Sequence, residues 1–215
     1  WSESEEEEMR AHNLSYEQLY WRRLKLGQLG SMQKFRREYP SNIEDAYSVA
    51  GNIYLSKEDL QDVEVMQVEP LELTIFAEPD KNDKYAIGVD ISAGVGRDFS
   101  VIYVISKRTH SPVALYRSNL VTPVYLAERI VDLAIKYNNA MVLAESNNYG
   151  HVTIREMHHL GYNQLWLDNG KDWLTTLKSK TRMFENLKKK ITGGHVRSID
   201  NIAYSELRAI TINDK

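Results

Sequence analysis

The sequence lacks several features, and each absence excludes a class of protein. None of its 215 residues is cysteine, which excludes a disulfide scaffold, a thiolate metal site and a cysteine nucleophile. No apolar run approaches the roughly 20 residues that a membrane-spanning helix needs, and the acidic start does not have the pattern of a signal peptide. No stretch has the form Gly-x-x-x-x-Gly-Lys-Ser/Thr, so we expect no ATP hydrolysis through a phosphate-binding loop.

The charge is nearly balanced overall but unevenly distributed along the chain. The formal net charge is −3, from 27 Lys+Arg and 30 Asp+Glu. Residues 1–80 contain 8 basic and 17 acidic residues, whereas residues 171–215 contain 10 basic and 5 acidic residues. Either different partners meet the two ends, or surface charge is simply scattered unevenly.

We expect a helical segment over residues 1–78 and a separate domain over residues 79–215. The acidic run Glu5–Glu8 is typical of the start of a helix, and apolar residues at helical spacing predict a second helix from Ser15. A short helix is predicted over residues 41–46.

The rest of the first segment is interpreted as a connection. Residues 56–84 are rich in Glu, Asp and Pro, with a short strand predicted over residues 72–76. The first residue is Trp1 rather than methionine, so we expect a piece of a longer chain.

From residue 85 the pattern changes to strands and helices. Buried-strand patterns predict three successive strands, and a tight polar turn joins the last two into a hairpin. Helical spacing then alternates with short apolar runs. The predicted elements are strands at 85–91, 99–106 and 112–118, a helix from 123, a strand at 140–144, a helix at 150–160, a strand at 164–167, a basic helix at 179–191, an extended segment at 195–199 and a further element from 204. The order is βββαβαβα.

This order is that of the ribonuclease H-like fold, an α/β fold in which helices flank a mixed sheet. Strands one to three are antiparallel, and strand four arrives through a crossover helix to lie parallel beside strand one. Asp90 lies near the end of strand one and Glu145 closes strand four. Because neighbouring strands are about 4.8 Å apart, both carboxylates are expected at the same end of the sheet.

Two carboxylates this close repel each other unless a positive charge lies between them. Mg²⁺ or Mn²⁺ can provide it, since hard divalent cations prefer oxygen ligands. Two such ions can orient a water and stabilise both oxygens of a phosphodiester displacement. We therefore predict a two-metal site with Asp90 and Glu145 as catalytic residues and metal ligands. In the alternative, Asp90 caps a loop amide and Glu145 pairs with an arginine.

A turn after the first predicted strand carries a third candidate. Asp98 follows Gly94 and Gly96, and it either serves as an accessory metal ligand or caps the turn. The two glycines would let a backbone approach phosphate, but turn formation alone explains them.

These residues and the motifs around them resemble the nuclease domain of the large terminase subunit of tailed bacteriophages. The resemblance covers most of the chain from about residue 33, and it depends on the order and spacing of short motifs. The matching stretches are Gly88-Val89-Asp90, Gly96-Arg97-Asp98-Phe99-Ser100, Val142-Leu143-Ala144-Glu145-Ser146-Asn147, Trp173-Leu174-Thr175-Thr176 leading to Lys180, Lys188 through Gly193-Gly194, and Ser205-Glu206-Leu207.

The resemblance implies a metal-dependent endonuclease that cuts concatemeric double-stranded DNA during genome packaging. Asp90 matches the first acidic ligand of the family and Glu145 the second. The resemblance also implies a third acid from a later helix, and neither Asp200 nor Asp214 fits that pattern. Either the domain is truncated at its C-terminus and lacks this ligand, or a different residue fills the third position. Implied partners are the packaging ATPase domain of the same protein, the small terminase subunit and the portal. The implied location is the host cell cytoplasm, with no membrane association.

The basic tail offers candidate DNA contacts. Its cations fall on and around one predicted helix: Lys178, Lys180, Arg182, Lys188, Lys189 and Lys190. Such a face could hold the DNA backbone without reading bases, or it could be a solvated helix face. Trp166 and Trp173 could stack on bases or pack in the protein interior.

Two other functions remain open at this point. A non-catalytic module of the same fold could hold DNA or a partner protein, and the missing third acid favours it. A phosphotransferase of the actin and sugar-kinase type shares the strand order, but it needs a second similar domain.

Overall fold

The computed structural model describes residues 2–30, 35, 38–39, 53–68 and 72–211. Its contacts divide the chain into two compact units, Trp1–Ser56 with Ser205–Lys215 and, separately, Lys57–Tyr204. Each unit is described by itself. Within the described ranges, no helix is both long enough and apolar enough to cross a membrane.

The smaller unit contains two helices that begin with complete capping motifs. In α1 (Glu3–His12) and α2 (Tyr16–Leu29), the N-cap serine and the third helical residue exchange hydrogen bonds, which satisfies two backbone donors. Arg23 of α2 donates to Glu5 of α1 (Nε–Oε1 2.7 Å), and this bond is the main reason that the pKa of Glu5 is lowered to about 2. The two predicted helices are confirmed, whereas the helix predicted over 41–46 lies outside the described residues.

The larger unit is built around a mixed five-stranded sheet of order β2-β5-β4-β3-β6. The pairs β2–β5, β5–β4 and β4–β3 are antiparallel, and β3–β6 is parallel. The strands are β2 (Leu73–Ile75), β3 (Tyr85–Asp90), β4 (Ser100–Ser106), β5 (Pro112–Ser118) and β6 (Met141–Ala144). The predicted fold class is confirmed, because three antiparallel strands are followed by a strand parallel to the first.

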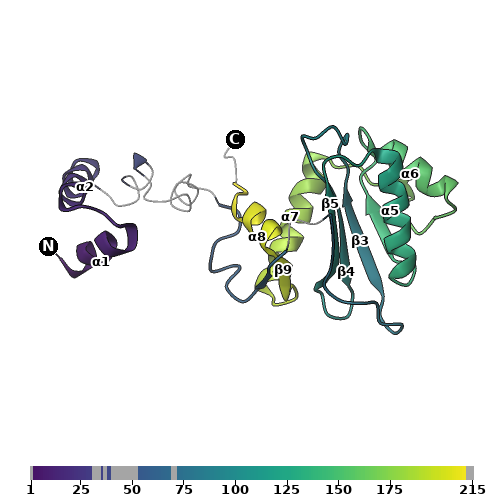
Figure 1. The fold of residues 1–215 in the computed structure, drawn as a ribbon, viewed down its shortest axis with the longest axis horizontal. Helices are drawn as coiled ribbons and strands as arrows, with labels where there is room; N and C mark the ends of the chain where they lie inside the picture. The colour runs from purple at the N-terminus through teal and green to yellow at the C-terminus, as the bar shows by residue number, and fades with distance from the viewer. Residues whose placement is uncertain (1, 31–34, 36–37, 40–52, 69–71, 212–215) are drawn as a thin grey trace. The chain divides into compact units, whose positions relative to one another are not determined.

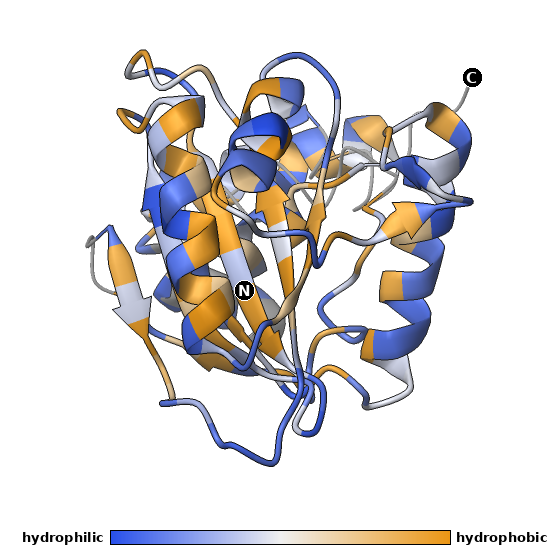
Figure 2. Cartoon of the chain, turned by 90° about the vertical axis from the view of Figure 1, so that its right-hand side faces the viewer, coloured by the Kyte–Doolittle hydropathy of each residue, from blue (hydrophilic) through white to orange (hydrophobic). Residues whose placement is uncertain are grey.

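One face of this sheet is covered by α5 (Pro123–Lys136) and α6 (Gly150–His159) (Figure 1). Proline suits the first turn of α5, where no backbone N–H is needed, and the apolar residues of α5 recur at helical spacing. Figure 2 shows largely hydrophobic strands behind helices that are hydrophobic along part of their surface. Core residues with at most 1% exposure include Ile87, Ile102, Val104, Leu126, Ile130, Ala134, Val142 and Met157.

The opposite face carries α7 (Leu177–Thr192) and β9 (Ser198–Asp200) (Figure 1). β9 pairs in parallel with β1 (Glu64–Met66). Asp200 is 1% exposed, and its Oδ1 accepts hydrogen bonds from the backbone of Ile202 and Ala203 at the start of α8 (Asn201–Arg208). Burial, together with the charge of Asp200, raises the pKa of Tyr103 on β4.

Two parts of this unit differ from the sequence-based expectation. Residues 164–167 were expected to form a sheet strand, but Leu165 makes an isolated bridge to Val142, and β7 (Leu167–Asp168) pairs with β8 (Lys171–Asp172) instead. Residues 56–84 were interpreted as a connection with one short strand at 72–76, but β1 within them pairs with β9. Contacts group Lys57–Tyr204 together, and the domain boundary at residue 79 stays a prediction.

Candidate metal and nucleic-acid site

The end of the sheet where β3 and β6 finish brings two of the candidate acids together. In the parallel register, Val89 is opposite Ala144, so Asp90 and Glu145 are the next residues on adjacent strands. Parallel neighbours lie about 4.8 Å apart. The predicted adjacency of these strands is confirmed, and the role of the two carboxylates stays a prediction.

The electrostatics of Asp90 reflect this crowding. Loss of hydration raises the pKa of Asp90, the backbone of Ile91 opposes the shift by hydrogen bonding, and the negative charges of Glu145 and Asp98 raise the pKa further. Asp90, the last residue of β3, is exposed to solvent. The charges of Glu145 and Asp98 thus act on Asp90, and negative charge gathered in this way favours a cation at this point.

Glu145 is held more firmly than Asp90. Its Oε1 accepts a hydrogen bond from the backbone N–H of Thr175 (3.1 Å), and Trp173 forms a parallel bridge with it. Behind it, a Cβ on Gly150 would overlap the carbonyl oxygen of Glu145 and lie 2.8 Å from its carbonyl carbon. The first residue of α6 must therefore be glycine for the helix to approach the strand end this closely.

The loop between β3 and β4 is organised by its own backbone contacts. The N–H of Ser92 donates to Ser100 Oγ (2.9 Å), and the N–H of Gly96 donates to the carbonyl of Asn119 (2.8 Å). Gly94 has φ +70°, and a Cβ there would overlap the carbonyl oxygen of Val121. Turn formation and close packing thus account for the glycines, while Asp98 lies exposed on the same loop.

A complete metal site needs further ligands. Within the described ranges, no three Asp, Glu or His side chains converge closely enough to hold an ion. Asp90 and Glu145 offer the hard oxygens that Mg²⁺ or Mn²⁺ prefers, so they fit part of such a site. Asp200 does not complete it, because this buried carboxylate caps α8, and Asp214 lies outside the described residues.

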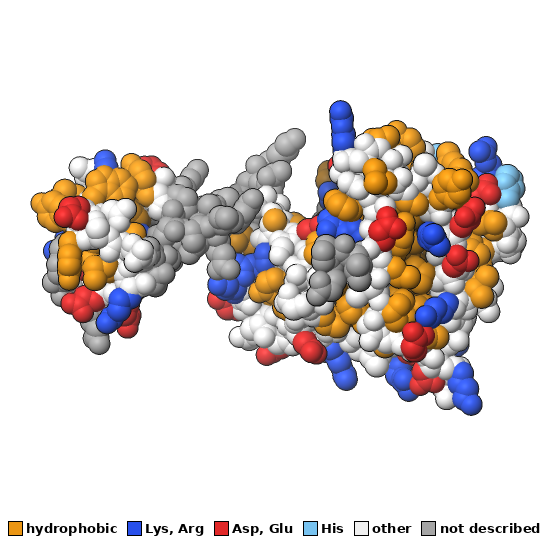
Figure 3. All heavy atoms as spheres, in the orientation of Figure 1, with side chains coloured by type: hydrophobic (Ala, Val, Ile, Leu, Met, Phe, Trp, Pro, Cys, Tyr) orange, Lys and Arg blue, Asp and Glu red, His pale blue; other side chains and the backbone are white. Residues whose placement is uncertain are grey.

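The candidate DNA-binding cations separate into two groups along α7. Lys178 and Lys180 are exposed in its first turns, close in sequence to the Thr175 amide. Lys189 and Lys190 are exposed in the last turn, and Lys188 pairs with Asp59 (2.9 Å). The 16 residues of α7 span about 24 Å, so the two groups lie at opposite ends; Arg182, between them, is exposed. Lys and Arg side chains are interspersed with Asp and Glu on the face of the larger unit in Figure 3.

The structure adds two features that residue types alone did not indicate. The first is the backbone donor of Thr175. The second is Arg117. Asp90 on β3 is opposite Val101 on β4, and Val101 is opposite Arg117 on β5, so the three side chains share one face of the sheet. The guanidinium of Arg117 lies over the ring of Phe99, 4.0 Å from its centroid, and this contact fixes a cation beside the acidic end.

The two tryptophans pack against each other, and Trp166 remains 39% exposed. Trp173 is 5% exposed, and its ring centroid is 5.5 Å from that of Trp166 in an edge-to-face arrangement. Interior packing therefore accounts for Trp173.

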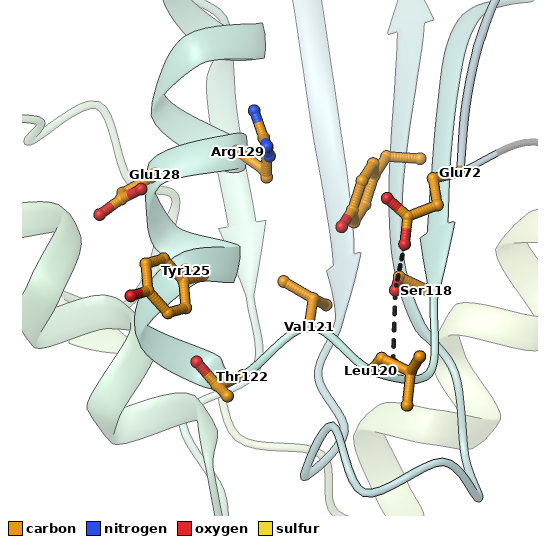
Figure 4. A pocket seen from close by; sticks show the side chains of 9 residues that line it. Glu72, Ser118, Leu120, Val121, Thr122, Tyr125, Glu128 and Arg129 are labelled. Carbon is orange, nitrogen blue, oxygen red and sulfur yellow. Dashed lines mark hydrogen bonds between the residues drawn. The ribbon is translucent and has the colours of Figure 1, made fainter.

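A polar cavity of about 250 Å³ lies between α5 and the edge of the sheet (Figure 4). Glu72 accepts a hydrogen bond from Ser118 in its wall (2.9 Å), and Arg129 and Glu128 come from α5. None of the candidate acids lines this cavity. It is therefore separate from the carboxylate pair.

Comparison with solved structures identifies proteins that share this fold. No model of a known protein family matches the sequence, and no curated protein matches it. The large terminase nuclease of thermophilic phage G20c with bound magnesium is 21% identical over 77% of this chain and 84% of that chain, with a TM-score of 0.66. The same nuclease with bound cobalt is 22% identical over the same shares, with a TM-score of 0.65. The Thermus phage P74-26 large terminase nuclease domain is 20% identical over 74% of this chain and 77% of that chain, with a TM-score of 0.59. The chain therefore has the ribonuclease H-like α/β fold of large terminase nuclease domains.

Proposed function

We propose that the larger unit is the metal-dependent endonuclease domain of a viral terminase large subunit, and that it hydrolyses phosphodiester bonds of double-stranded DNA. The observation that carries this proposal is the parallel β3–β6 register. It brings Asp90 and Glu145 to one sheet end, where the charge of Glu145 acts on Asp90. The solved nucleases of this fold include forms with bound magnesium, cobalt and zinc, which supports the same class of chemistry.

Asp90 and Glu145 would hold Mg²⁺ or Mn²⁺, with Asp98 as an accessory ligand. Held there, one or two such ions would supply Lewis-acid activation of water and stabilisation of the negative charge that develops during phosphodiester hydrolysis. The two carboxylates supply negative charge, and their oxygens are suited to hard cations.

DNA would be held by the cations of α7 and by Arg117 on the sheet. Lys178, Lys180 and Arg182 are exposed on the half of α7 that follows Thr175. Lys189 and Lys190 are exposed at its far end, where Lys188 pairs with Asp59. Arg117 adds a cation in the same row across the sheet as Asp90. Contacts of this kind bind phosphates without reading bases, so we expect cutting with little sequence specificity.

In this role the chain would work with the packaging ATPase domain of its own protein, the small terminase subunit and the portal. Its site of action would be the cytoplasm of an infected host cell. These partners follow from the shared fold and from the motifs in the sequence.

The test is nicking of supercoiled plasmid in Mn²⁺, comparing the chain with Asp90→Asn and Glu145→Gln. Both variants remove a negative charge with little change of shape, so both are expected to lose at least 100-fold in rate. Asp132→Asn, an exposed position on α5, is the matched control and should retain full activity. Equal nicking by the parent and both variants would reject the assignment.

A non-catalytic DNA-binding module is the second candidate. It is favoured by the finding that no three potential ligands converge within the described ranges. It predicts that the parent chain binds DNA but does not nick it at any Mn²⁺ concentration. The phosphotransferase alternative needs a second domain of this kind, and the described residues contain one five-stranded sheet.

A further inference from the structure

The segment Trp173–Thr175 lies beside the end of β6, to which it is joined by an isolated bridge. Trp173 and Glu145 form a parallel bridge, and the carbonyl of Trp173 accepts hydrogen bonds from both the backbone N–H (2.7 Å) and the hydroxyl (2.9 Å) of Ser146. Trp173 thus continues the backbone pairing at the end of β6, next to the carboxylate that closes this strand.

This segment reaches the carboxylate itself. The N–H of Thr175 donates to Glu145 Oε1 (3.1 Å), and within the described part of the chain this is the hydrogen bond that the carboxylate accepts. The indole N–H of Trp173 donates to Thr175 Oγ1 (3.2 Å), which ties Thr175 to a ring that is 5% exposed. The orientation of Glu145 therefore depends on a buried side chain two positions before Thr175.

We propose that Trp173 and Thr175 are positioning residues, which hold the Glu145 carboxylate in one orientation and leave Oε2 for a divalent cation. The inference deepens the proposed nuclease function and rests on it. A carboxylate restrained at one oxygen does not have to be ordered when the ion binds, so the restraint raises the affinity of the site.

The same segment connects the carboxylate to the basic helix. Thr176 is the N-cap of α7, and its hydroxyl accepts from the N–H of Ser179 (3.1 Å). Lys178 and Lys180 follow within the first turns. A phosphate held by these lysines would therefore lie near the residue that orients Glu145.

The experiment breaks the Trp173–Thr175 hydrogen bond from each side in the full chain. Trp173→Phe removes the donor and keeps an aromatic ring, and Thr175→Val removes the acceptor at nearly constant shape. Thr175→Ser retains the hydroxyl and serves as the rescue variant. Trp21→Phe in α2 and Thr181→Val are matched controls, since each makes the same chemical change outside this hydrogen bond.

Two readouts are independent of catalysis. The first is the Mn²⁺ dissociation constant, measured by electron paramagnetic resonance. We expect about tenfold weaker binding for Trp173→Phe and for Thr175→Val, the typical effect of losing a partner behind a metal ligand, with no further loss in the double variant. The second is the hydrogen-exchange rate of the Thr175 amide, which should increase in both variants and stay slow in Thr175→Ser and in both controls.

The outcomes distinguish a failure of the positioning role from a failure of the proposed metal-dependent nuclease function. If Glu145→Gln abolishes Mn²⁺ binding but Trp173→Phe and Thr175→Val bind as tightly as the parent, the positioning role is wrong and the metal site stands. If Glu145→Gln binds Mn²⁺ like the parent, the proposed site is wrong and the positioning role falls with it. Circular dichroism of each variant shows whether the fold is retained, and Thr175→Val alone suffices if Trp173→Phe does not fold.

Discussion

Replacing Gly150 with alanine should destabilise the larger unit, even though alanine is the better helix former. Gly150 is the first residue of α6, and a Cβ there would overlap the backbone carbonyl of Glu145. Because the obstacle is backbone, no side-chain rotation relieves it. The helix or the end of β6 would have to move.

The magnitude follows from two opposing effects. Forcing an additional carbon into a packed site costs about 1–3 kcal/mol, and a rigid obstacle places this site near the upper figure. Alanine gains at most about 1 kcal/mol over glycine in a helix interior, and less at the first position. The expected net loss is about 2 kcal/mol, which lowers the Tm of a domain of this size by about 4–8 °C.

The assay is scanning calorimetry of Gly150→Ala beside Gly88→Ala. Gly88 lies in the middle of β3, and a Cβ there would meet no atom within 4 Å. That variant should unfold at the parent temperature or slightly above it, since glycine weakens a strand interior. A Tm for Gly150→Ala equal to or above that of the parent would refute the close approach of α6 to Glu145.

Three further predictions concern the charges and the loop around the site. The folded pKa of Asp90 is raised, so its contribution to stability is greatest below the unfolded pKa of about 3.8 and is lost as the pH rises through the folded pKa. Asp90→Asn should therefore raise the Tm of the metal-free chain at pH 7, where the carboxylate is charged, and leave the Tm unchanged at pH 3. Lys178→Gln with Lys180→Gln should weaken DNA binding and reduce the salt slope by about 1.8, measured by fluorescence anisotropy, whereas Lys188→Gln should change it less because Lys188 pairs with Asp59. Gly94→Ala should lower the Tm more than Gly96→Ala, because both glycines have positive φ but only the first would press a Cβ against backbone.

The sheet was predictable from the sequence because each central strand has a strong local signal. β3, β4 and β5 are apolar runs bounded by turn residues, and their predicted limits match the structure within one residue. The adjacency of Asp90 and Glu145 followed from the order of elements, since a crossover helix between parallel strands leaves few arrangements.

Other elements lack such a signal. β1 is three residues long and largely exposed, and its partner β9 lies far along the chain, so no local pattern marks it. The apolar run at 164–167 was interpreted as a sheet strand, but only Leu165 within it bridges to β6, and the residue that bridges to Glu145 is Trp173. The donor to Glu145 is a backbone N–H, which every residue except proline carries, so residue type could not identify it. Arg117 became a candidate only through the register of β3, β4 and β5.

The most direct test of the central claim is to locate Mn²⁺ on the ¹⁵N-labelled chain by paramagnetic broadening of its amide signals. The account predicts that the amides of Asp90, Glu145 and Thr175 broaden first, and that Glu145→Gln abolishes this effect. Broadening centred on the acidic run Glu5–Glu8, or unchanged broadening in Glu145→Gln, would contradict the claim that these two carboxylates form the metal site.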